Sequence, residues 1–411
     1  MEHVTTLIIG AGHAGLALSR ALTHRSVEHV LLERGGPGHA WRSERWDSLR
    51  MLTPNWANGL PGAAYDGPEP DGFMTATEFA DRLERYARAI AAPIRRGVTV
   101  TRVTRKDAGF RVETDHGIWA AETVVNATGA TRLPRIPALA RDLPSDIEQL
   151  TPHNYRNSEQ LPEGDVLVVG ASASGVQLAR EIQLAGRHVT LAVGAHVRLP
   201  RRYRGRDIEF WLHRSGIYDE RASEVEDLAK ARRLPSAQLF GGGPVDLNAL
   251  QLLGVEITGR LAAIREGKAL FSGGLHNVVT AADLKMHRTL DRIDDWLEGH
   301  AETSGLATMR RPGPTAIPDQ PRLSLDLRRG TVKAIIWATG YAADHSWMDL
   351  PVFDARGRLQ HDGGVCPLPG LFVTGLPLLR RRRSHHISGA AADAQDLSYL
   401  ITQHLDARRA A

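Results

Sequence analysis

In this 411-residue chain, the fold is indicated most directly by the segment Thr6-Leu7-Ile8-Ile9-Gly10-Ala11-Gly12-His13-Ala14-Gly15. Its apolar first half is typical of a buried β-strand, and its second half is a G-x-G-x-x-G sequence that opens a helical pattern. Glycines at these places permit a tight strand-to-helix turn and let the backbone approach a pyrophosphate at the helix N-terminus. The stretch therefore predicts a dinucleotide-binding site.

A second copy of this pattern lies 160 residues further along the chain. Val166-Leu167-Val168-Val169 precede Gly170-Ala171-Ser172-Ala173-Ser174-Gly175, and a helical pattern follows. A lone glycine motif is a weak signal, but two motifs in this context predict two bound dinucleotides, which usually means a flavin reduced by a nicotinamide. We therefore predict an α/β protein built from two Rossmann-like, three-layer dinucleotide-binding domains.

The end of the next strand distinguishes the two sites. From Gly10, a step of 23 residues reaches Glu33, whose carboxylate can accept hydrogen bonds from ribose hydroxyls and fits FAD or NAD. The same step from Gly170 reaches Val193, and no carboxylate stands there. Since an acid repels a 2′-phosphate and arginine binds it, the second site is predicted to take NADP. The arginines expected to contact this phosphate follow in the next loop, at Arg198, Arg201 and Arg202, with a solvated surface loop as the alternative.

A repeated tripeptide predicts how the domains are connected. Ala127-Thr128-Gly129 and Ala338-Thr339-Gly340 each follow an apolar strand. We predict that the NADP domain, residues 151–330, is inserted into an FAD domain formed by residues 1–150 and a return segment, 331–411. In the return segment, a strand ends at Gly375 and a helix opens near Ser388. The small residues at that helix start would face the flavin, or the helix would simply dock on the domain.

Further patterns predict elements around these sites. Residues 75–91 read as an amphipathic helix with Thr75 or Thr77 as its cap, and residues 283–297 as a helix. Strands are expected at 250–257, 261–264 and 269–271. The inward positions of the 283–297 helix are expected to be Leu284, Met286, Leu290, Ile293 and Leu297. The long loop at 35–72 is expected to lie against a ligand.

Composition limits the partners. With 42% hydrophobic and 24% charged residues and a net charge of +4, the chain is typical of a soluble globular protein. No nucleic-acid-reading motif is present, and the run Arg380–Arg383 is interpreted as a solvated loop, so no nucleic-acid partner is expected. The first strand begins almost at Met1, and no apolar run approaches the length of a membrane span. We predict a cytoplasmic protein with no membrane partner.

Cysteine and histidine usage excludes several chemistries. Cys366 is the sole cysteine, so an internal disulfide is impossible, and reductases that pass electrons to a paired dithiol are excluded. Cysteine-based metal clusters are excluded for the same reason. The eighteen histidines show no metal-ligand spacing, and His361, His385 and His386 are assigned to loops or the surface, so no metal is expected.

Together with the two glycine motifs, three shorter elements carry a family resemblance: Trp41-Arg42, Leu52-Thr53-Pro54 and Trp337-Ala338-Thr339-Gly340-Tyr341. With them, nearly the whole chain resembles the flavin-containing monooxygenases. It is especially similar to a bacterial branch often labelled as flavoproteins of potassium transport.

The resemblance implies roles for residues of both sites. At the FAD site, the adenosine and pyrophosphate would be held by Gly10, Gly12, Ala14, Gly15, Glu33 and Arg34. The flavin side would be lined by Trp41, Arg42 and Thr53, while Gly340 and Gly375 would also contact cofactor, and Ala127, Thr128 and Gly129 would pass beneath at the hinge. NADPH would be cradled by Gly170, Ser172, Ser174 and Gly175.

The implied activity is an NADPH-dependent, FAD-containing monooxygenase. Such enzymes activate O₂ as a flavin C4a-peroxide and oxygenate a small organic substrate at a nitrogen, sulfur or carbonyl centre. One alternative is an NADPH-dependent flavin oxidoreductase or dehydrogenase that passes electrons to another acceptor. A further alternative is a nucleotide-sensing regulatory flavoprotein. The sequence assigns no catalytic residue, leaves Asn55, Asn58 and His153 without a role, and leaves the oligomeric state open, a homodimer included.

Overall fold

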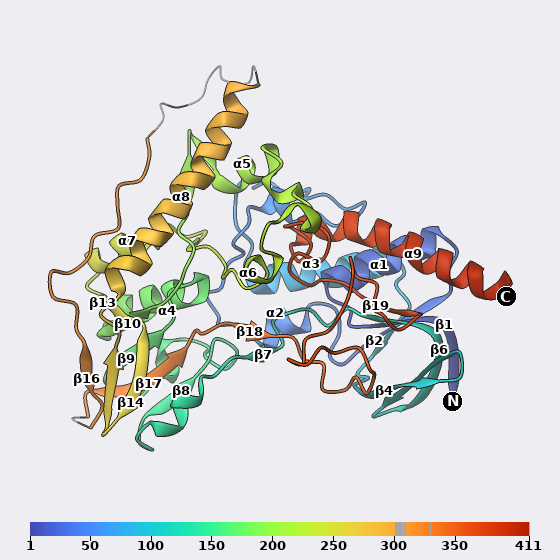
Figure 1. Cartoon of the computed structure of the whole chain (residues 1–411), viewed down its shortest axis with the longest axis horizontal. Helices are drawn as coiled ribbons and strands as arrows, with labels where there is room; N and C mark the ends of the chain where they lie inside the picture. Colours follow the sequence, from blue (N-terminus) through green and yellow to red (C-terminus); the bar gives the residue numbers. More distant parts are fainter. Residues whose placement is uncertain (301–306, 308–309, 329, 411) are drawn as a thin grey trace.

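The computed structural model describes residues 1–300, 307, 310–328 and 330–410. Two mainly parallel sheets lie at opposite ends of the molecule, each with its own helices (Figure 1). We call the sheet with the N-terminal strand and its surroundings the first unit, and the other sheet and its surroundings the second unit. The arrangement confirms the predicted α/β class with two Rossmann-like units.

The first unit is built on a seven-stranded sheet. Its strand order is β3-β2-β1-β6-β5-β4, and β19 lies beside the carboxyl half of β6. Strands β1, β2, β3, β6 and β19 run parallel, whereas β4 and β5 form an antiparallel meander with β6. The bounds are β1 Glu2–Ile9, β2 His29–Glu33, β3 Ile94–Arg96, β4 Val100–Lys106, β5 Gly109–Thr114, β6 Gly117–Asn126 and β19 Leu371–Val373.

Helices cover one face of the first sheet. Helices α1 (His13–His24) and α9 (Ala390–Ala410) pack against each other, and α3 (Ala76–Ala89) lies beside them (Figure 1). α3 begins with a capping box, in which Thr75 accepts from the Glu78 amide and Glu78 accepts from the Thr75 amide. Of the two predicted caps, Thr75 is therefore confirmed.

The second unit is built on a five-stranded, all-parallel sheet of order β13-β10-β9-β17-β8. Its bounds are β8 Glu148–Leu150, β9 Asp165–Val169, β10 Val189–Val193, β13 Glu256–Gly259 and β17 Val332–Trp337. Every residue of β10 is buried, as expected for a parallel strand covered on both faces. Since β8 and β17 pair in this sheet, the second unit begins before residue 151 and extends beyond 330, which corrects both predicted boundaries.

Two predictions within the second unit were wrong in detail. Residues 250–252 belong to helix α7 (Leu247–Leu252), because the Asp246 side chain caps its first turn, and the strand begins only at Glu256. Helix α8 (Leu275–Glu298) starts earlier than predicted, and Leu284 is 51% exposed. Leu284 lies two residues before the buried Met286, which turns it roughly 200° around the helix axis and away from the core. The other four inward positions are buried as predicted.

Both units have three layers. In the first unit, alternate residues of the parallel strands enter two apolar clusters. One lies against α1, α3 and α9, and the other is shared with the β4–β5 end of the same sheet and with the segment at 348–352. In the second unit, one cluster lies against α4 (Ala173–Leu184), α7 and the start of α8. The other lies against a small antiparallel sheet of β14 Leu261–Arg265, β15 Lys268–Phe271 and β16 Ser324–Asp326.

Two chain segments cross between the units side by side. Strands β7 (Leu133–Pro134) and β18 (Tyr341–Ala342) pair antiparallel, and the Arg135 amide donates to the Gly340 carbonyl at 2.9 Å. Figure 1 places this ribbon between the two sheets. The geometry supports the inserted-domain arrangement, because the chain leaves and re-enters the first unit through one paired ribbon.

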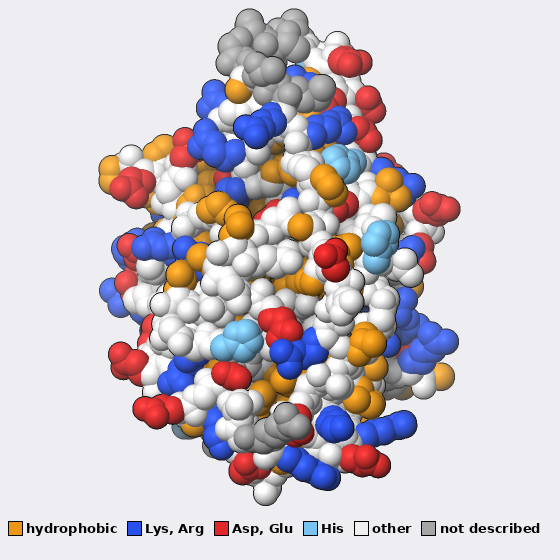
Figure 2. Space-filling view, turned by 90° about the vertical axis from the view of Figure 1, so that its left-hand side faces the viewer, with side chains coloured by type: hydrophobic (Ala, Val, Ile, Leu, Met, Phe, Trp, Pro, Cys, Tyr) orange, Lys and Arg blue, Asp and Glu red, His pale blue; other side chains and the backbone are white. Residues whose placement is uncertain are grey.

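The surface of the second unit is mixed in charge. Figure 2 shows basic, acidic and apolar side chains interspersed over the end of the molecule formed by this unit. Within the part of the chain that the structure describes, no helix is long and apolar enough to cross a membrane.

Candidate dinucleotide sites

The first glycine turn is closed by the backbone that follows β6. Gly10 has a φ of +105°, and a Cβ added there would lie 2.8 Å from the Ala127 carbonyl oxygen. A Cβ on Gly15 would collide with the Gly10 carbonyl and lie 3.4 Å from the Ala127 Cβ. Neither neighbour can yield, because both belong to backbone at the ends of paired strands. Both glycines are therefore required by the turn itself.

The second turn repeats this construction. Gly170 has a φ of +108°, and its missing Cβ would collide with the Ala338 carbonyl. A Cβ on Gly175 would collide with the Gly170 carbonyl and lie 3.3 Å from the Ala338 Cβ. Each Ala-Thr-Gly copy therefore packs its alanine into one glycine turn, a close-packing role that sequence analysis missed when it assigned the tripeptides to hinges.

Both helix N-termini at these turns lack side-chain caps. Gly12 is the N-cap of α1 and Ser172 is the N-cap of α4, and neither position has a side-chain cap hydrogen bond. A Cβ added to Gly12 would meet nothing within 4 Å. Uncapped helix amides attract an anion, so both turns fit a dinucleotide pyrophosphate, and the first turn also has open space before its amides.

Further predicted residues gather at the first turn. Gly375, at the end of β19, has a φ of +75°, and a Cβ there would lie 3.1 Å from the Ala14 Cβ. The Thr128 amide and hydroxyl donate to the Asn126 side chain at 3.1 and 2.8 Å, and Gly129 has a φ of +78°. The carboxyl ends of β1, β6 and β19 therefore form one edge, where a Rossmann fold binds its ligand.

Glu33 lies at the same edge. Its carboxylate accepts from the Ala11 amide at 2.8 Å and from the Gly35 amide at 3.1 Å. The side chain therefore stands against the first glycine loop, where the prediction places a ribose. Arg34 forms an ion pair with Glu44, so the charge of Arg34 is already paired. The same carboxylate also binds Arg132 at 2.6 Å.

We expect the Glu33→Gln variant to bind FAD about tenfold more weakly, ~1.4 kcal/mol, because the amide keeps an acceptor for Ala11 but loses the charge that strengthens a ribose contact. A flavin titration of the apoprotein measures this effect. Glu78→Gln, at the cap of α3, is the matched control, and equal affinities in Glu33→Gln and the parent would contradict the ribose assignment.

The long loop at 35–72 contacts both units. Trp41, in helix α2 (His39–Ser43), packs against the clusters of both units and meets Phe79 edge-on at 5.1 Å. Arg42 was predicted to line the flavin, but its exposed side chain pairs with Asp81 on α3 at 2.7 Å. This correction follows from the one-turn helix, which turns Trp41 inward and its neighbour toward solvent.

Two asparagines in this loop hold its shape. Asn55 donates to the Glu69 carbonyl at 2.9 Å and accepts from the Met74 amide at 2.8 Å. Asn58 accepts from the Thr53 hydroxyl at 2.6 Å and donates to the Thr53 and Pro54 carbonyls. Thr53 is therefore tied to Asn58, and both amides serve the loop itself.

The arginines predicted to contact a 2′-phosphate are mostly engaged elsewhere. The Arg198 guanidinium is buried and binds Asp246 at 2.9 Å, Asp283 at 2.8 Å and the Gly313 carbonyl. Arg201 donates to the Leu52 carbonyl at 2.7 Å and pairs with Asp207. The assignments of Arg198 and Arg201 to the phosphate are therefore corrected. Their place in the sequence did not reveal that carboxylates pair with both guanidinium groups. Arg202 is exposed and donates to the Gly205 carbonyl.

Another arginine lies where the second ribose is expected. Arg260 directly follows β13, whose last residue pairs with Val193 at the end of β10. A Cβ on Gly194 would lie 3.8 Å from the Arg260 Cγ. Arg260 is exposed and makes no ion pair with any described carboxylate. No local pattern in the sequence indicates Arg260, because it lies 67 residues after Val193 and only the pairing of β10 with β13 brings it to this place.

An aromatic pair covers the second turn. Ser174 hydrogen-bonds to Tyr341, which directly follows Gly340, and the His153 ring stacks on Tyr341 at 4.9 Å. Burial lowers the pKa of His153 and raises that of the Tyr341 phenol. Both rings therefore stay neutral beside the predicted NADP site.

A cluster of imidazoles lies where the two units meet. His13, in the first turn of α1, hydrogen-bonds to the backbone of His385, and His386 meets Tyr218 edge-on at 4.9 Å. His213 also meets Tyr218 at 4.9 Å. Burial lowers the pKa of His13 and of His213 to about 4, so both are neutral at physiological pH. Each carries a buried Nε2 without a partner among the described residues, which fits a polar group of a bound molecule.

Glu209 lies beneath this cluster. Its buried carboxylate accepts from the Tyr218 hydroxyl at 2.9 Å, and burial raises its pKa from 4.5 to about 7. Because the native carboxyl then keeps its proton while the unfolded one loses it, the stability contributed by Glu209 is complete below pH 4.5 and is lost as pH rises through 7.

We therefore expect Glu209→Gln to remove this decline. Between pH 5 and pH 8, its unfolding free energy should fall by about 2–3 kcal/mol less than that of the parent. Urea denaturation at both pH values measures the difference. Glu226→Gln, at an exposed position, is the control, and parallel pH profiles of parent and Glu209→Gln would contradict the raised pKa.

Cys366, the sole cysteine, is inert in this fold. Cys366 is buried beside β19, and burial raises the pKa of its thiol to about 12. Among the residues that the structure describes, no group of three or more His, Cys, Asp or Glu side chains is placed to hold a metal ion.

Comparison with known proteins agrees with this geometry. The family model of the pyridine nucleotide-disulphide oxidoreductases matches residues 7–213. The chain belongs to this family. Over 410 residues it is 31% identical to an uncharacterized CzcO-like oxidoreductase of Geobacillus kaustophilus (strain HTA426), which covers 98% of this chain and 100% of the relative.

Two monooxygenases are also similar to it. A flavin-containing monooxygenase from Stenotrophomonas maltophilia has the same fold, with a TM-score of 0.69, 18% identity, and coverage of 98% of this chain and 100% of that chain. The present chain is also 30% identical to a probable indole-3-pyruvate monooxygenase, YUCCA1, of Arabidopsis thaliana. This match extends over 206 residues, which are 48% of this chain and 49% of the relative. The resemblance to flavin-containing monooxygenase-like flavoproteins is confirmed. The chain is a flavoprotein oxidoreductase with FAD and NADP as cofactors, as predicted.

Proposed function

We propose that this protein is an NADPH-dependent, FAD-containing monooxygenase that transfers one oxygen atom from O₂ to a small organic substrate. The observation that carries the proposal is the pair of glycine turns of equal construction, both leading into a helix without a side-chain cap, with Glu33 at the first and no acid at the second. A flavin and a nicotinamide would bind at these turns, and the buried Cys366 is no acceptor for their electrons. The two monooxygenases that it resembles support the same choice.

The residues of the chain have distinct tasks in this proposal. FAD would rest on Gly10, Gly12 and Gly15, with its ribose at Glu33, and when bound it supplies hydride acceptance and oxygen activation. NADPH would rest on the second turn beneath Tyr341. The buried loop at 51–58 and the imidazole cluster would exclude water between the units and orient the substrate.

The proposed substrate is a soft nucleophile, such as an amine or a sulfide, or a carbonyl compound. The orphan nitrogens of His13 and His213 are neutral, and the Trp56 ring meets the His213 ring edge-on at 5.3 Å. Neutral polar atoms beside aromatic rings suit a small, uncharged substrate group better than a strongly charged one.

The test is the fate of oxygen during NADPH oxidation. The FAD-loaded protein is mixed with NADPH under ¹⁸O₂ and a panel of amines, sulfides and ketones, and products are analysed by mass spectrometry. One ¹⁸O atom in a product for each NADPH consumed supports the proposal. Flavin reduction by NADPH with anaerobic transfer to an added acceptor, and no label in any product, would favour the reductase instead. NADPH binding without flavin reduction would favour the regulatory alternative.

A further inference from the structure

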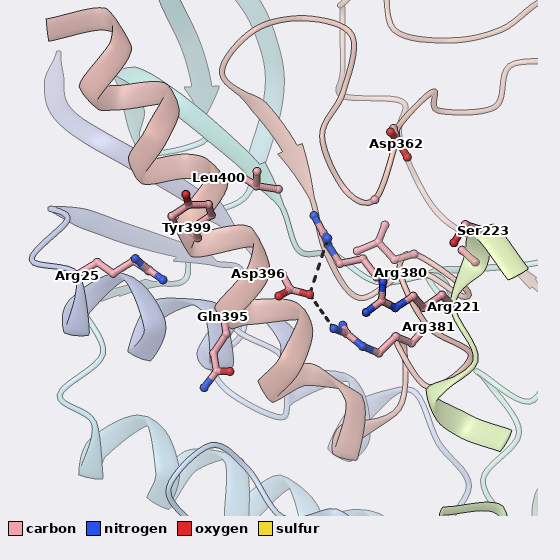
Figure 3. Close-up of a pocket in the computed structure, with 13 residues that line it drawn as sticks. Arg25, Arg221, Ser223, Asp362, Arg380, Arg381, Gln395, Asp396, Tyr399 and Leu400 are labelled. Carbon is pink, nitrogen blue, oxygen red and sulfur yellow. Dashed lines mark hydrogen bonds and ion pairs between the residues drawn. The ribbon is translucent and has the colours of Figure 1, made fainter. Parts of the chain in front are cut away.

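A pocket of about 670 Å³ lies on the outside of the first unit, at its border with the second. Figure 3 shows the elements that enclose it: helix α9, the loop at 379–381, the segment at 221–223 and the residue that follows α1. The charged and aromatic side chains in its lining include those of Arg25, Arg221, Arg380, Arg381, Asp396 and Tyr399.

This pocket is separate from both glycine turns. Arg25 directly follows the C-terminal end of α1, whereas the FAD turn lies at its N-terminal end. Twelve residues of α-helix span roughly 18 Å, so α1 separates the two places. None of the residues that line the pocket was assigned to a cofactor.

The pocket holds more positive than negative charge. Four arginines line it, and the only carboxylates among its described lining residues are Asp362 and Asp396. Arg381 is satisfied, since it binds both Asp393 and Asp396 at 2.9 Å. Arg380 shares Asp396 at 3.8 Å and keeps a buried Nε without a described partner.

The other two guanidinium groups have no acidic partner among the described residues. Arg25 donates to the Ser398 hydroxyl at 3.0 Å and lies over the Tyr399 ring at 5.4 Å, so its position is fixed by neutral contacts. Arg221 is exposed at the opposite side, where Figure 3 shows it beside Arg380 and Arg381. Like charges in one concavity repel each other, and a bound anion would relieve that repulsion.

The rim of the pocket is rigid enough to present these charges together. The Ala222 amide donates to the Arg380 carbonyl at 2.8 Å, and Arg221 bridges to Arg381 in an antiparallel backbone contact. The 379–381 loop is fixed in turn by Ser384, whose hydroxyl accepts from the Arg380 and Arg381 amides at 3.0 and 2.9 Å. Side chains from both units are therefore held around one space.

We propose that this pocket binds a compact anion with two or more negative charges, carried by phosphate or carboxylate groups. Guanidinium groups recognise both kinds of oxyanion through paired N–H donors. The anion would be held between Arg221 from the second unit and Arg25 and Arg380 from the first, and would thereby tie the two units together. This site is independent of the proposed oxygen transfer and does not require it.

The test uses FAD-loaded protein saturated with NADP⁺, so that both dinucleotide sites are filled. Isothermal titration calorimetry is performed with pyrophosphate and, separately, with citrate at constant ionic strength. Saturable binding of either anion at one site per chain is expected, and the tighter of the two identifies phosphate or carboxylate as the preferred chemistry. The variant Arg25→Gln/Arg221→Gln should bind it at least tenfold more weakly.

The matched control is Arg233→Gln/Arg288→Gln, which removes the same charge from two exposed arginines outside the pocket. It should bind the anion like the parent. Circular dichroism and flavin content establish that both double variants are folded and loaded. Absence of saturable binding for both anions, or an equal loss in the control variant, would overturn the proposal.

Discussion

The Gly12→Val variant should lose FAD while its apoprotein stays folded. Gly12 has a φ of −72° and a ψ of −176°, which valine adopts without strain, and a Cβ there meets nothing within 4 Å. Nothing inside the protein therefore requires glycine at this position. If a pyrophosphate lies against the uncapped start of α1, the valine side chain would occupy its space, and we expect FAD affinity to fall at least about a hundredfold, ~2.7 kcal/mol.

Two controls separate this effect from damage to the turn. Gly12→Ser places the small residue that the second turn carries at Ser172, and it should retain most of the FAD affinity. Gly273→Val makes the same change at an exposed glycine whose Cβ also meets nothing, and it should have no effect. Flavin titration and urea denaturation of the apoproteins provide both readouts. Full FAD retention in Gly12→Val would remove the first turn from the cofactor site, whereas an unfolding free energy lower by more than about 1 kcal/mol would assign the glycine to the fold.

The periodic parts of the fold could be predicted from the sequence because they depend on local pattern. Apolar runs followed by glycine turns predicted the first parallel strand and helix of each unit, and the pattern at 75–91 predicted α3 with Thr75 as one of two possible caps. Apolar residues alone could not separate a short helix from a strand at 250–252, because Asp246 acts through a cap that the hydrophobic pattern does not contain. Leu284 shows the same limit, since an apolar residue on a helix can face solvent.

The candidate site was predictable where a residue acts through its own backbone. Gly15 and Gly175 are fixed by the carbonyls of Gly10 and Gly170, five residues before them, and Gly10 and Gly170 have a positive φ that favours glycine. Side chains that act at a distance were not predictable. The charge of Arg198 depends on acids 48 and 85 residues away, which no local pattern reveals.

The Arg260→Gln variant should lose its selectivity between NADPH and NADH. Parallel pairing of β10 and β13 brings Arg260 beside Gly194, at the strand end where a Rossmann fold holds the adenosine ribose. Val193 leaves no acid there to repel a 2′-phosphate, and the Arg260 guanidinium has no ion pair with any carboxylate in the described parts of the chain. We expect the Kd for NADPH to rise about 30-fold, ~2 kcal/mol, while the Kd for NADH, which lacks the phosphate, stays unchanged.

Arg202→Gln is the informative comparison, because Arg202 is the exposed member of the arginines that follow β10. Kd values for both coenzymes follow from anaerobic flavin reduction at increasing coenzyme concentration. If Arg260 binds the phosphate, only Arg260→Gln changes the NADPH to NADH ratio. A change in Arg202→Gln alone would restore the assignment made from the loop, and an equal loss for both coenzymes in Arg260→Gln would mean that the side chain supports the strand end instead of reading the phosphate. The ratio of the two Kd values separates these outcomes, because NADPH and NADH differ only in the 2′-phosphate. A general weakening of the site raises both Kd values equally and leaves their ratio unchanged.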